Sequence, residues 1–192
     1  MAMDKQISNT RKMCYHHLRN LYQIKDLLST EKLKTLVHAY ITSRIDFCNS
    51  LLVGSTQKQL SRLQVLHNSS ARMLTNTSKY DSISPILYQL HWLPIKFRIL
   101  FKVLTMAHKF IYGINTPSYI NLQIKKPQRV TRAASYAELS CPETPRLKSV
   151  GYKSLYFSIA TEWNKLPGYM RNEHSFNMFK TALKTHLFEL AF

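Results

Sequence analysis

Four aspartates are the first residues to test for metal-assisted chemistry. They are Asp4, Asp26, Asp46 and Asp81, and no two of them are adjacent. Phosphoryl transfer through two divalent metals needs carboxylates clustered around both ions, because the metals align the attacking hydroxyl and neutralise charge on the phosphate. Asp46 lies between Ile45 and Phe47 and is better explained as a helix-surface or salt-bridging group. The sequence therefore predicts no catalytic carboxylate cluster.

Zinc-binding residue types occur together once near the start of the chain, where Cys14 is followed by His16 and His17. A third and a fourth ligand at zinc-finger spacing are absent, so we interpret these histidines as ordinary residues of a helix. The sequence has no G-x-S-x-G motif, no phosphate-binding glycine loop and no H-E-x-x-H motif. We predict no catalytic residue, no metal, no cofactor and no small-molecule substrate.

Basic side chains dominate the composition. The chain has 27 Lys and Arg against 10 Asp and Glu, a formal net charge of +17 and a sequence pI near 10.0. No acidic residue occurs between Asp81 and Glu138, whereas that interval contains Lys96, Arg98, Lys102, Lys109, Lys125, Lys126, Arg129 and Arg132. This regional excess of positive charge predicts an anionic partner.

A long helix over residues 91–113 is the element around which the chain is organised. Pro94 fits the first helical turn, and Gly113 fits the position just past the end, where a left-handed residue is favoured. Apolar residues cover a wide arc of this helix, which predicts that it is mostly buried. We expect the remaining polar track to meet solvent: Arg98, Lys102, Thr105 and Lys109.

Two aromatic sites have two interpretations each, base stacking and core packing. His91 and Trp92 precede the central helix and offer flat rings to a nucleic-acid base. An aromatic residue just before a buried helix more often packs against that helix, however, so we interpret both as core residues. The same interpretation applies to Trp163.

Helical periodicity continues through most of the chain. It predicts helices over residues 8–28, 30–54 and 57–74, the third opening with a capping box at Thr56 and Gln59. A short helical piece over residues 86–90 precedes the central helix. Helix returns over residues 155–166 and, behind a Ser175 cap, over residues 176–190.

Repeated prolines interrupt residues 114–150 and leave only short segments between them. We therefore predict a mainly α protein in three parts: a helical bundle at 1–113, a basic, Pro-rich connection at 114–150 and a C-terminal helical segment at 151–192. Residues 139–141 and 146–150 are candidates for a short hairpin in the connection.

The cysteines and the hydropathy of the chain indicate the cellular compartment that we expect for it. Cys14, Cys48 and Cys141 are far apart and odd in number, which favours neither a disulfide framework nor a zinc ribbon. We expect a reducing, intracellular compartment, either nucleus or cytoplasm. No uncharged apolar run of about 18 residues and no signal peptide is evident, so we expect no transmembrane segment.

Several phrases of the sequence resemble a known family. They are LVHAY at 36–40, SRIDFCNSLL at 43–52, LHWLPI at 90–95, WNKLP at 163–167 and SFNMFKTALKTHLF at 175–188. These phrases follow the order found downstream of the polymerase palm in jockey-like non-LTR retrotransposon (LINE-type) reverse transcriptases. The resemblance covers the chain from about residue 14 to residue 192. Where the family has a basic and serine-rich run, this chain has QRVTRAA at residues 128–134. This difference predicts a weaker contact by basic side chains there.

The resemblance implies that the chain is the C-terminal part of such a transposable-element enzyme, comprising the helical thumb and the region after it. The palm is then expected upstream of Met1. The parent activity is that of an RNA-directed DNA polymerase, but the paired aspartates of the palm are missing. We therefore predict that this chain alone is inactive and that it binds RNA or an RNA/DNA template-primer without sequence preference.

We assign this binding to cations of the acid-free interval: Arg98, Lys102, Lys109, Lys125, Lys126, Arg129 and Arg132. Phosphate contacts from Lys and Arg give affinity without sequence choice. Two alternatives remain open. In the first, the chain is a decayed retroelement remnant or a helical protein-interaction scaffold with no independent activity. In the second, its basic faces adhere to anionic lipids.

Overall fold

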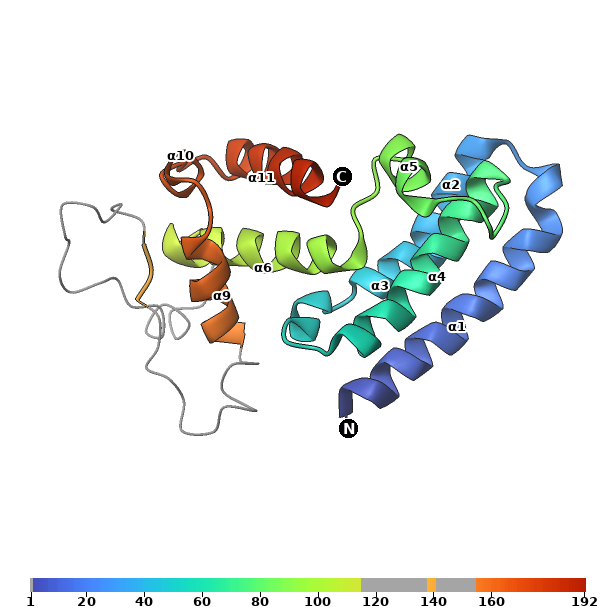
Figure 1. The fold of residues 1–192 in the computed structure, drawn as a ribbon, viewed down its shortest axis with the longest axis horizontal. Helices are drawn as coiled ribbons and strands as arrows, with labels where there is room; N and C mark the ends of the chain where they lie inside the picture. Colours follow the sequence, from blue (N-terminus) through green and yellow to red (C-terminus); the bar gives the residue numbers. More distant parts are fainter. Residues whose placement is uncertain (1, 115–137, 141–154) are drawn as a thin grey trace.

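The computed structural model describes residues 2–114, 138–140 and 155–192, and these ranges contain helices and no strand. This confirms the predicted mainly α fold. The helices, shown in Figure 1, are α1 (Ala2–Ile24), α2 (Thr30–Val37), α3 (Ser43–Asp46), α4 (Gln57–Thr75), α5 (Ile83–Gln89), α6 (Ile95–Ile111), α9 (Leu155–Asn164), α10 (Gly168–Arg171) and α11 (Phe176–Ala191). Short 3₁₀ turns occur at Lys25–Leu27 and Asn49–Leu52, and a π-helical turn at His38–Thr42 joins α2 to α3.

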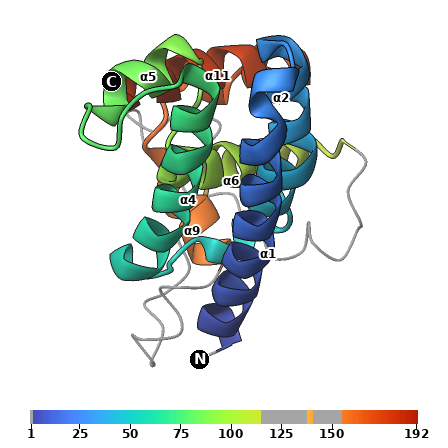
Figure 2. The same cartoon turned by 90° about the vertical axis from the view of Figure 1, so that its right-hand side faces the viewer.

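The N-terminal helices form a bundle in which α1, α2 and α4 lie side by side (Figure 2). Helix α1 buries Ile7, Cys14 and Leu21, which recur on one stripe of the helix. It begins at Ala2, earlier than the predicted start near residue 8, because Ile7 belongs to the core and Asp4 pairs with Arg62 of α4 at 3.7 Å.

The helix predicted over residues 30–54 is interrupted. The helical run through α2 and α3 ends at Asp46, after which Cys48 adopts a left-handed conformation with φ 51°. Asn49 Nδ2 donates a hydrogen bond of 3.2 Å to Asp46 Oδ1 across this break. The prediction of helix up to residue 54 was therefore wrong in its last turns.

Helix α6 begins at Ile95, four residues later than the predicted start at residue 91, and Pro94 is its N-cap. Its end at Ile111, two residues before Gly113, is close to the prediction. Its first amide, on Ile95, donates to Gln64 Oε1 of α4 at 2.8 Å, so a side chain satisfies one of the free donors at the helix start. At the other end Gly113 has φ 68°, and the amide of Ile114 donates to the Lys109 carbonyl at 3.0 Å. This is the left-handed helix end for which a glycine is favoured.

Helix α6 connects the two halves of the described chain. It packs against α4 and the Asn49–Leu52 turn of the N-terminal half and against α9 and α11 of the C-terminal half, with α11 above it and α9 below it in Figure 1. Ile99, Val103, Leu104 and Ala107 of α6 are all at most 3% exposed. The prediction that this helix is mostly buried is confirmed, and its core side chains serve both the N-terminal bundle and the C-terminal helices.

The C-terminal helices are held on α6 by stacked rings. Trp163 of α9, Phe179 of α11 and His108 of α6 are fully buried, and the His108 ring lies 4.3 Å from that of Phe179. His108 Nε2 lies 2.8 Å from the carbonyl oxygen of Glu173, in the segment between α10 and α11. The interpretation of Trp163 as a core residue is therefore confirmed.

Residues 138–140 are the described part of the connection, and they dock on α9. Leu139 is 4% exposed, and its amide and carbonyl both bond to the side chain of Asn164, at 3.0 and 2.9 Å. Glu138 pairs with Arg171 of α10 at 3.2 Å. Helix α10, which starts after Pro167, was not predicted, and most of the candidate hairpin lies outside the described residues.

Substitution of Leu104 tests the central place of α6. Leu104 is 2% exposed, so Leu104→Ala removes buried methyl groups and leaves a cavity. We expect it to lower the free energy of unfolding by about 2–5 kcal/mol, measured by urea denaturation. The control Lys96→Ala, at an exposed position of the same helix, should change it by less than about 0.5 kcal/mol. Equal effects would place α6 outside the core.

Candidate functional site

A cavity of about 600 Å³ lies where the N-terminal bundle, α6 and α11 meet. Its lining comes from α2, α3 and the turns that follow them, from the segment between α5 and α6, and from α6 and α11. Five cations line it: Lys34, Arg98, Lys102, Lys180 and Lys184. Asp46 is the one carboxylate among its lining residues. We call this cavity the basic groove.

Each cation reaches the basic groove because a buried neighbour fixes its helix. On α11, Phe179, Leu183 and Leu187 are buried against α6, which leaves Lys180 and Lys184 one turn apart and exposed. Residues four apart share a helix face, so both lysines point along the same edge. Lys102 follows Arg98 by one turn on α6 in the same way, and it is exposed.

Arg98 is bound to a carboxylate rather than free. Its Nε donates to Asp46 Oδ1 at 3.0 Å, and its Nη2 donates to Asp46 Oδ2. The Arg98 side chain is 18% exposed and that of Asp46 is 36% exposed. Such a two-point pair fixes both side chains and neutralises most of the arginine charge. The structure confirms Asp46 as a salt-bridging group and corrects the expectation that Arg98 presents a free charge to solvent.

The predicted polar track of α6 is also divided by α11. Thr105 is 8% exposed and donates to the Lys102 carbonyl at 2.9 Å. Lys109 does not line the basic groove, and its Nζ lies 4.8 Å from the ring centroid of Phe176, a cation–π contact. The track is therefore not one solvent face, because the arc predicted to meet solvent is partly covered by the C-terminal helix.

The sequence analysis assigned three of these cations to no site. Lys180 and Lys184 share an outer helix face, which is a recognisable pattern, but Lys34 has no lysine one turn before or after it on α2. Only the folded arrangement brings Lys34 to the same recess as residues far along the chain. The predicted binding residues Lys125, Lys126, Arg129 and Arg132 lie outside the described residues.

His67 and Trp92 form a core wall behind the groove, and the exposed His38 lies against Trp92. Trp92 is 4% exposed and stacks on His67, with ring centroids 5.1 Å apart, while His38 meets its edge at 5.4 Å. Burial, helped by the nearby charge of Arg98, lowers the pKa of His67 to about 3. Burial and then Arg98 also lower the pKa of His38. His67 is therefore neutral at pH 7, and Trp92 is a core residue as predicted.

His91 differs from its neighbour Trp92. It is exposed, lines the basic groove and has φ 54°, a left-handed conformation that costs a non-glycine residue roughly 1–2 kcal/mol. The amide of Trp92 donates to the Leu87 carbonyl at 2.9 Å, which closes the end of α5. This turn sends Trp92 into the core and leaves His91 at the surface, so the core interpretation was wrong for His91.

Two further properties concern the described ranges as a whole. No three side chains of His, Cys, Asp or Glu lie close enough there to hold a metal ion. No helix in those ranges is both long and apolar enough to cross a membrane.

Comparison of the chain with protein-family models, with curated proteins and with solved structures found no match. The resemblance to retrotransposon reverse transcriptases therefore stays a prediction.

Removal of the Asp46 charge tests the ion pair. Asp46→Asn leaves Arg98 poorly exposed and without its carboxylate, and we expect the free energy of unfolding to fall by about 1–3 kcal/mol in urea denaturation. The matched control Asp26→Asn makes the same charge change at an exposed position and should alter it by less than about 0.5 kcal/mol. A stable Asp46→Asn protein would show that the pair contributes little to folding.

The pH dependence of stability tests the burial of His67. Its folded-state pKa of about 3 lies below the ordinary histidine pKa of 6.5, so between these values the unfolded chain binds more protons. This contribution to stability is fully present above pH 6.5 and is lost as the pH falls toward 3, by about 1.4 kcal/mol per pH unit. Urea denaturation at pH 7.5 and 5.5 measures it.

The control for this pH dependence is His67→Gln, which removes the titrating group. We expect a smaller stability difference between the two pH values in that variant, whatever its absolute stability. His16→Gln, at an exposed position, should retain the difference of the unmodified protein. An unchanged pH dependence in His67→Gln would assign the effect to other groups.

Proposed function

We propose that this chain is a non-catalytic nucleic-acid-binding module that holds the phosphate backbone of RNA or of an RNA/DNA template-primer in the basic groove. The observation that carries the proposal is the convergence of cations from three separated helices on one cavity. Lys34, Lys102, Lys180 and Lys184 keep charges that are not paired with Asp46 in the way that the Arg98 charge is. A recess with this excess of positive over negative charge attracts a polyanion.

The chemistry of the groove favours backbone contact over base recognition. Lysine is a flexible point charge that binds phosphate without fixed geometry, whereas base recognition relies on planar, two-point hydrogen bonding. The arginine of the groove, which has that planar geometry, is already occupied by Asp46. We therefore infer affinity without sequence preference.

The retrotransposon resemblance gives this module a place in a larger protein. We propose that the chain is the thumb and post-thumb region of a jockey-like non-LTR retrotransposon reverse transcriptase. The sequence phrases support this origin, and the helical fold is compatible with it. In that role the chain needs no catalytic group of its own, since it holds a substrate on which another domain acts.

A triple substitution in the groove tests the proposed function. Lys102→Gln, Lys180→Gln and Lys184→Gln together remove three charges from exposed side chains of the basic groove. Binding to a labelled duplex should fall with salt at a slope of roughly −0.9 per phosphate contact. We expect the triple variant to flatten the plot of log affinity against log salt by about two to three units, measured by fluorescence anisotropy.

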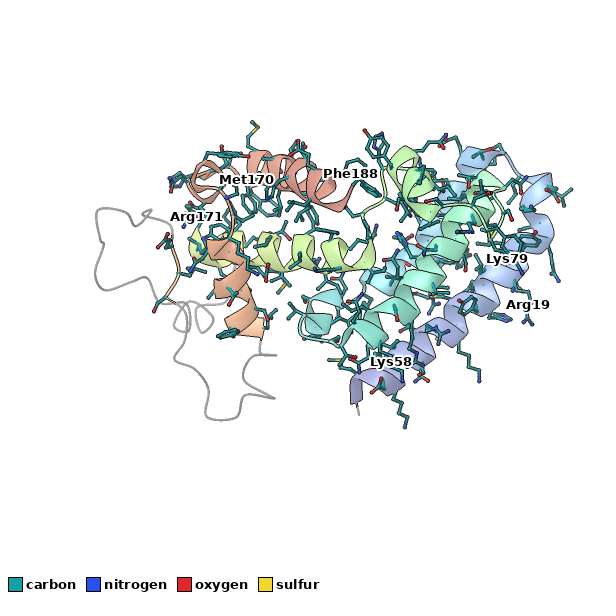
Figure 3. All side chains as sticks on the ribbon, in the orientation of Figure 1. Arg19, Lys58, Lys79, Met170, Arg171 and Phe188 are labelled. Atoms are coloured by element: carbon teal, nitrogen blue, oxygen red, sulfur yellow. The ribbon has the colours of Figure 1, made fainter. Side chains whose placement is uncertain are left out.

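The matched control removes three charges elsewhere. Lys5, Lys12 and Lys58 are exposed on α1 and α4, and none of them lines the groove (Figure 3 labels Lys58). Their replacement by Gln should change the slope by less than one unit. Equal losses from both triple variants would show that only net charge matters. A flat salt response of the unmodified protein would refute the proposal, and tighter binding to anionic vesicles than to duplex would favour the lipid alternative.

A further inference from the structure

An aromatic cluster adjoins the basic groove at the end of α11. It consists of Tyr88 on α5, His91 after α5, and Phe188 and Phe192 at the C-terminus. Phe188 is its centre, with ring centroids 5.2 Å from Tyr88, 5.7 Å from His91 and 4.9 Å from Phe192. Figure 3 labels Phe188 where α11 approaches α5.

The cluster remains largely open to solvent. Tyr88 is 56% exposed and Phe192 is 43% exposed, although both contact Phe188. A cluster that served only to close α11 onto α5 would gain most by burying these rings, since aromatic side chains bury large areas. Exposed ring surface is thus available for a flat apolar partner.

The aromatic cluster and the cations form one continuous surface. His91 lines the basic groove and also contacts Phe188, so it belongs to both. Lys184 and Phe188 are one turn apart on α11, which places a charge beside the cluster. A ligand that spans this surface needs anionic groups and flat rings at close intervals.

The floor of the groove adds a hydrogen-bond acceptor. Asn49 lines the groove, is 4% exposed, and its Oδ1 is buried without a hydrogen-bond partner among the described residues. A bare polyanion has nothing to donate to this oxygen, whereas the N–H groups of bases and the hydroxyls of ribose do. The surface therefore offers complementary groups to phosphate and ring together, and the buried, unpartnered Asn49 oxygen belongs to its lining.

We propose that the basic groove and the aromatic cluster bind single-stranded nucleic acid, with phosphates on Lys102, Lys180 and Lys184 and a base stacked on Tyr88 and Phe188. The inference rests on the proposed function and names the unpaired part of the template as its ligand. A duplex hides its base faces within the helical stack, so only an unpaired strand presents them to the rings. Lysine charge combined with exposed aromatic faces is the arrangement by which proteins bind single strands without sequence preference.

Three labelled probes of equal phosphate number test this inference by fluorescence anisotropy: a single strand, an abasic single strand and a duplex. We expect the unmodified protein to bind the single strand most tightly. Tyr88→Ala should weaken that binding by roughly 5- to 150-fold, which is the loss of one base–aromatic stack. The same variant should leave abasic and duplex binding, and the salt slope, unchanged.

Two matched variants complete the design. Tyr80→Ala removes a ring that is 84% exposed in the segment between α4 and α5, outside the cluster, and should leave all three affinities unchanged. Tyr88→Leu keeps an apolar side chain but removes the π face, and it should lose single-strand preference as Tyr88→Ala does. Thermal melting of each variant establishes that it is folded.

The outcomes separate this inference from the function on which it rests. Salt-dependent binding with equal affinity for all three probes, unaffected by Tyr88→Ala, would overturn the single-strand inference and leave phosphate binding intact. Retained single-strand preference in Tyr88→Leu would also overturn it, because apolar contact rather than stacking would then account for the preference. Absence of salt-dependent binding to any probe would refute the proposed function itself.

Discussion

Helix α6 carries apolar side chains around most of its circumference, and the rest of the structure follows from the need to bury them. A helix with one apolar stripe is satisfied by one neighbour, but a wide apolar arc requires cover on several sides. The N-terminal bundle covers part of α6, and α9 and α11 cover further parts from opposite sides (Figure 1). Helices that are remote in sequence are thereby brought to opposite rims of one recess, so the basic groove is a consequence of core packing.

Close approach of several cations has an electrostatic cost that the structure partly offsets. The pair between Arg98 and Asp46 neutralises a largely buried arginine, and water screens the exposed lysines around it. The charges left over are those on flexible side chains at the rim. Repulsion among them raises the free energy of the empty groove, and a bound polyanion relieves it. The proposed affinity for phosphate and the repulsion between like charges are therefore two aspects of one arrangement.

The sequence was sufficient for the parts of the fold that depend on local interactions. The capping box at Thr56 and Gln59 forms as predicted, and Gly113 ends α6 in a left-handed conformation. Predictions from local patterns were wrong where a tertiary contact determines where a helix begins or ends. The break after Asp46 accompanies its bond to Arg98, which is on another helix, and the early start of α1 accompanies the burial of Ile7.

The candidate site was less predictable than the fold for the same reason. Periodicity identified Lys102 as polar, but it gave no information on which element lies over the polar track. Since α11 covers part of that track, Thr105 is buried and Lys109 contacts Phe176 instead of open solvent. Lys34 joins the groove only because α2 packs against α1 and α4 in the bundle that α6 adjoins. A site assembled from three helices has no signature within any one of them.

Stability and charge are carried by different groups on the two sides of the groove wall. Behind the wall, the neutral His67 stacks on Trp92, and a proton on His67 would be a buried charge next to the cation Arg98. In front of it, Lys102, Lys180 and Lys184 are exposed at the rim. The core thus excludes additional positive charge while the surface accumulates it. This separation lets a strongly basic recess form over a tightly packed interior, because the charges that attract a ligand need not be desolvated to hold the fold.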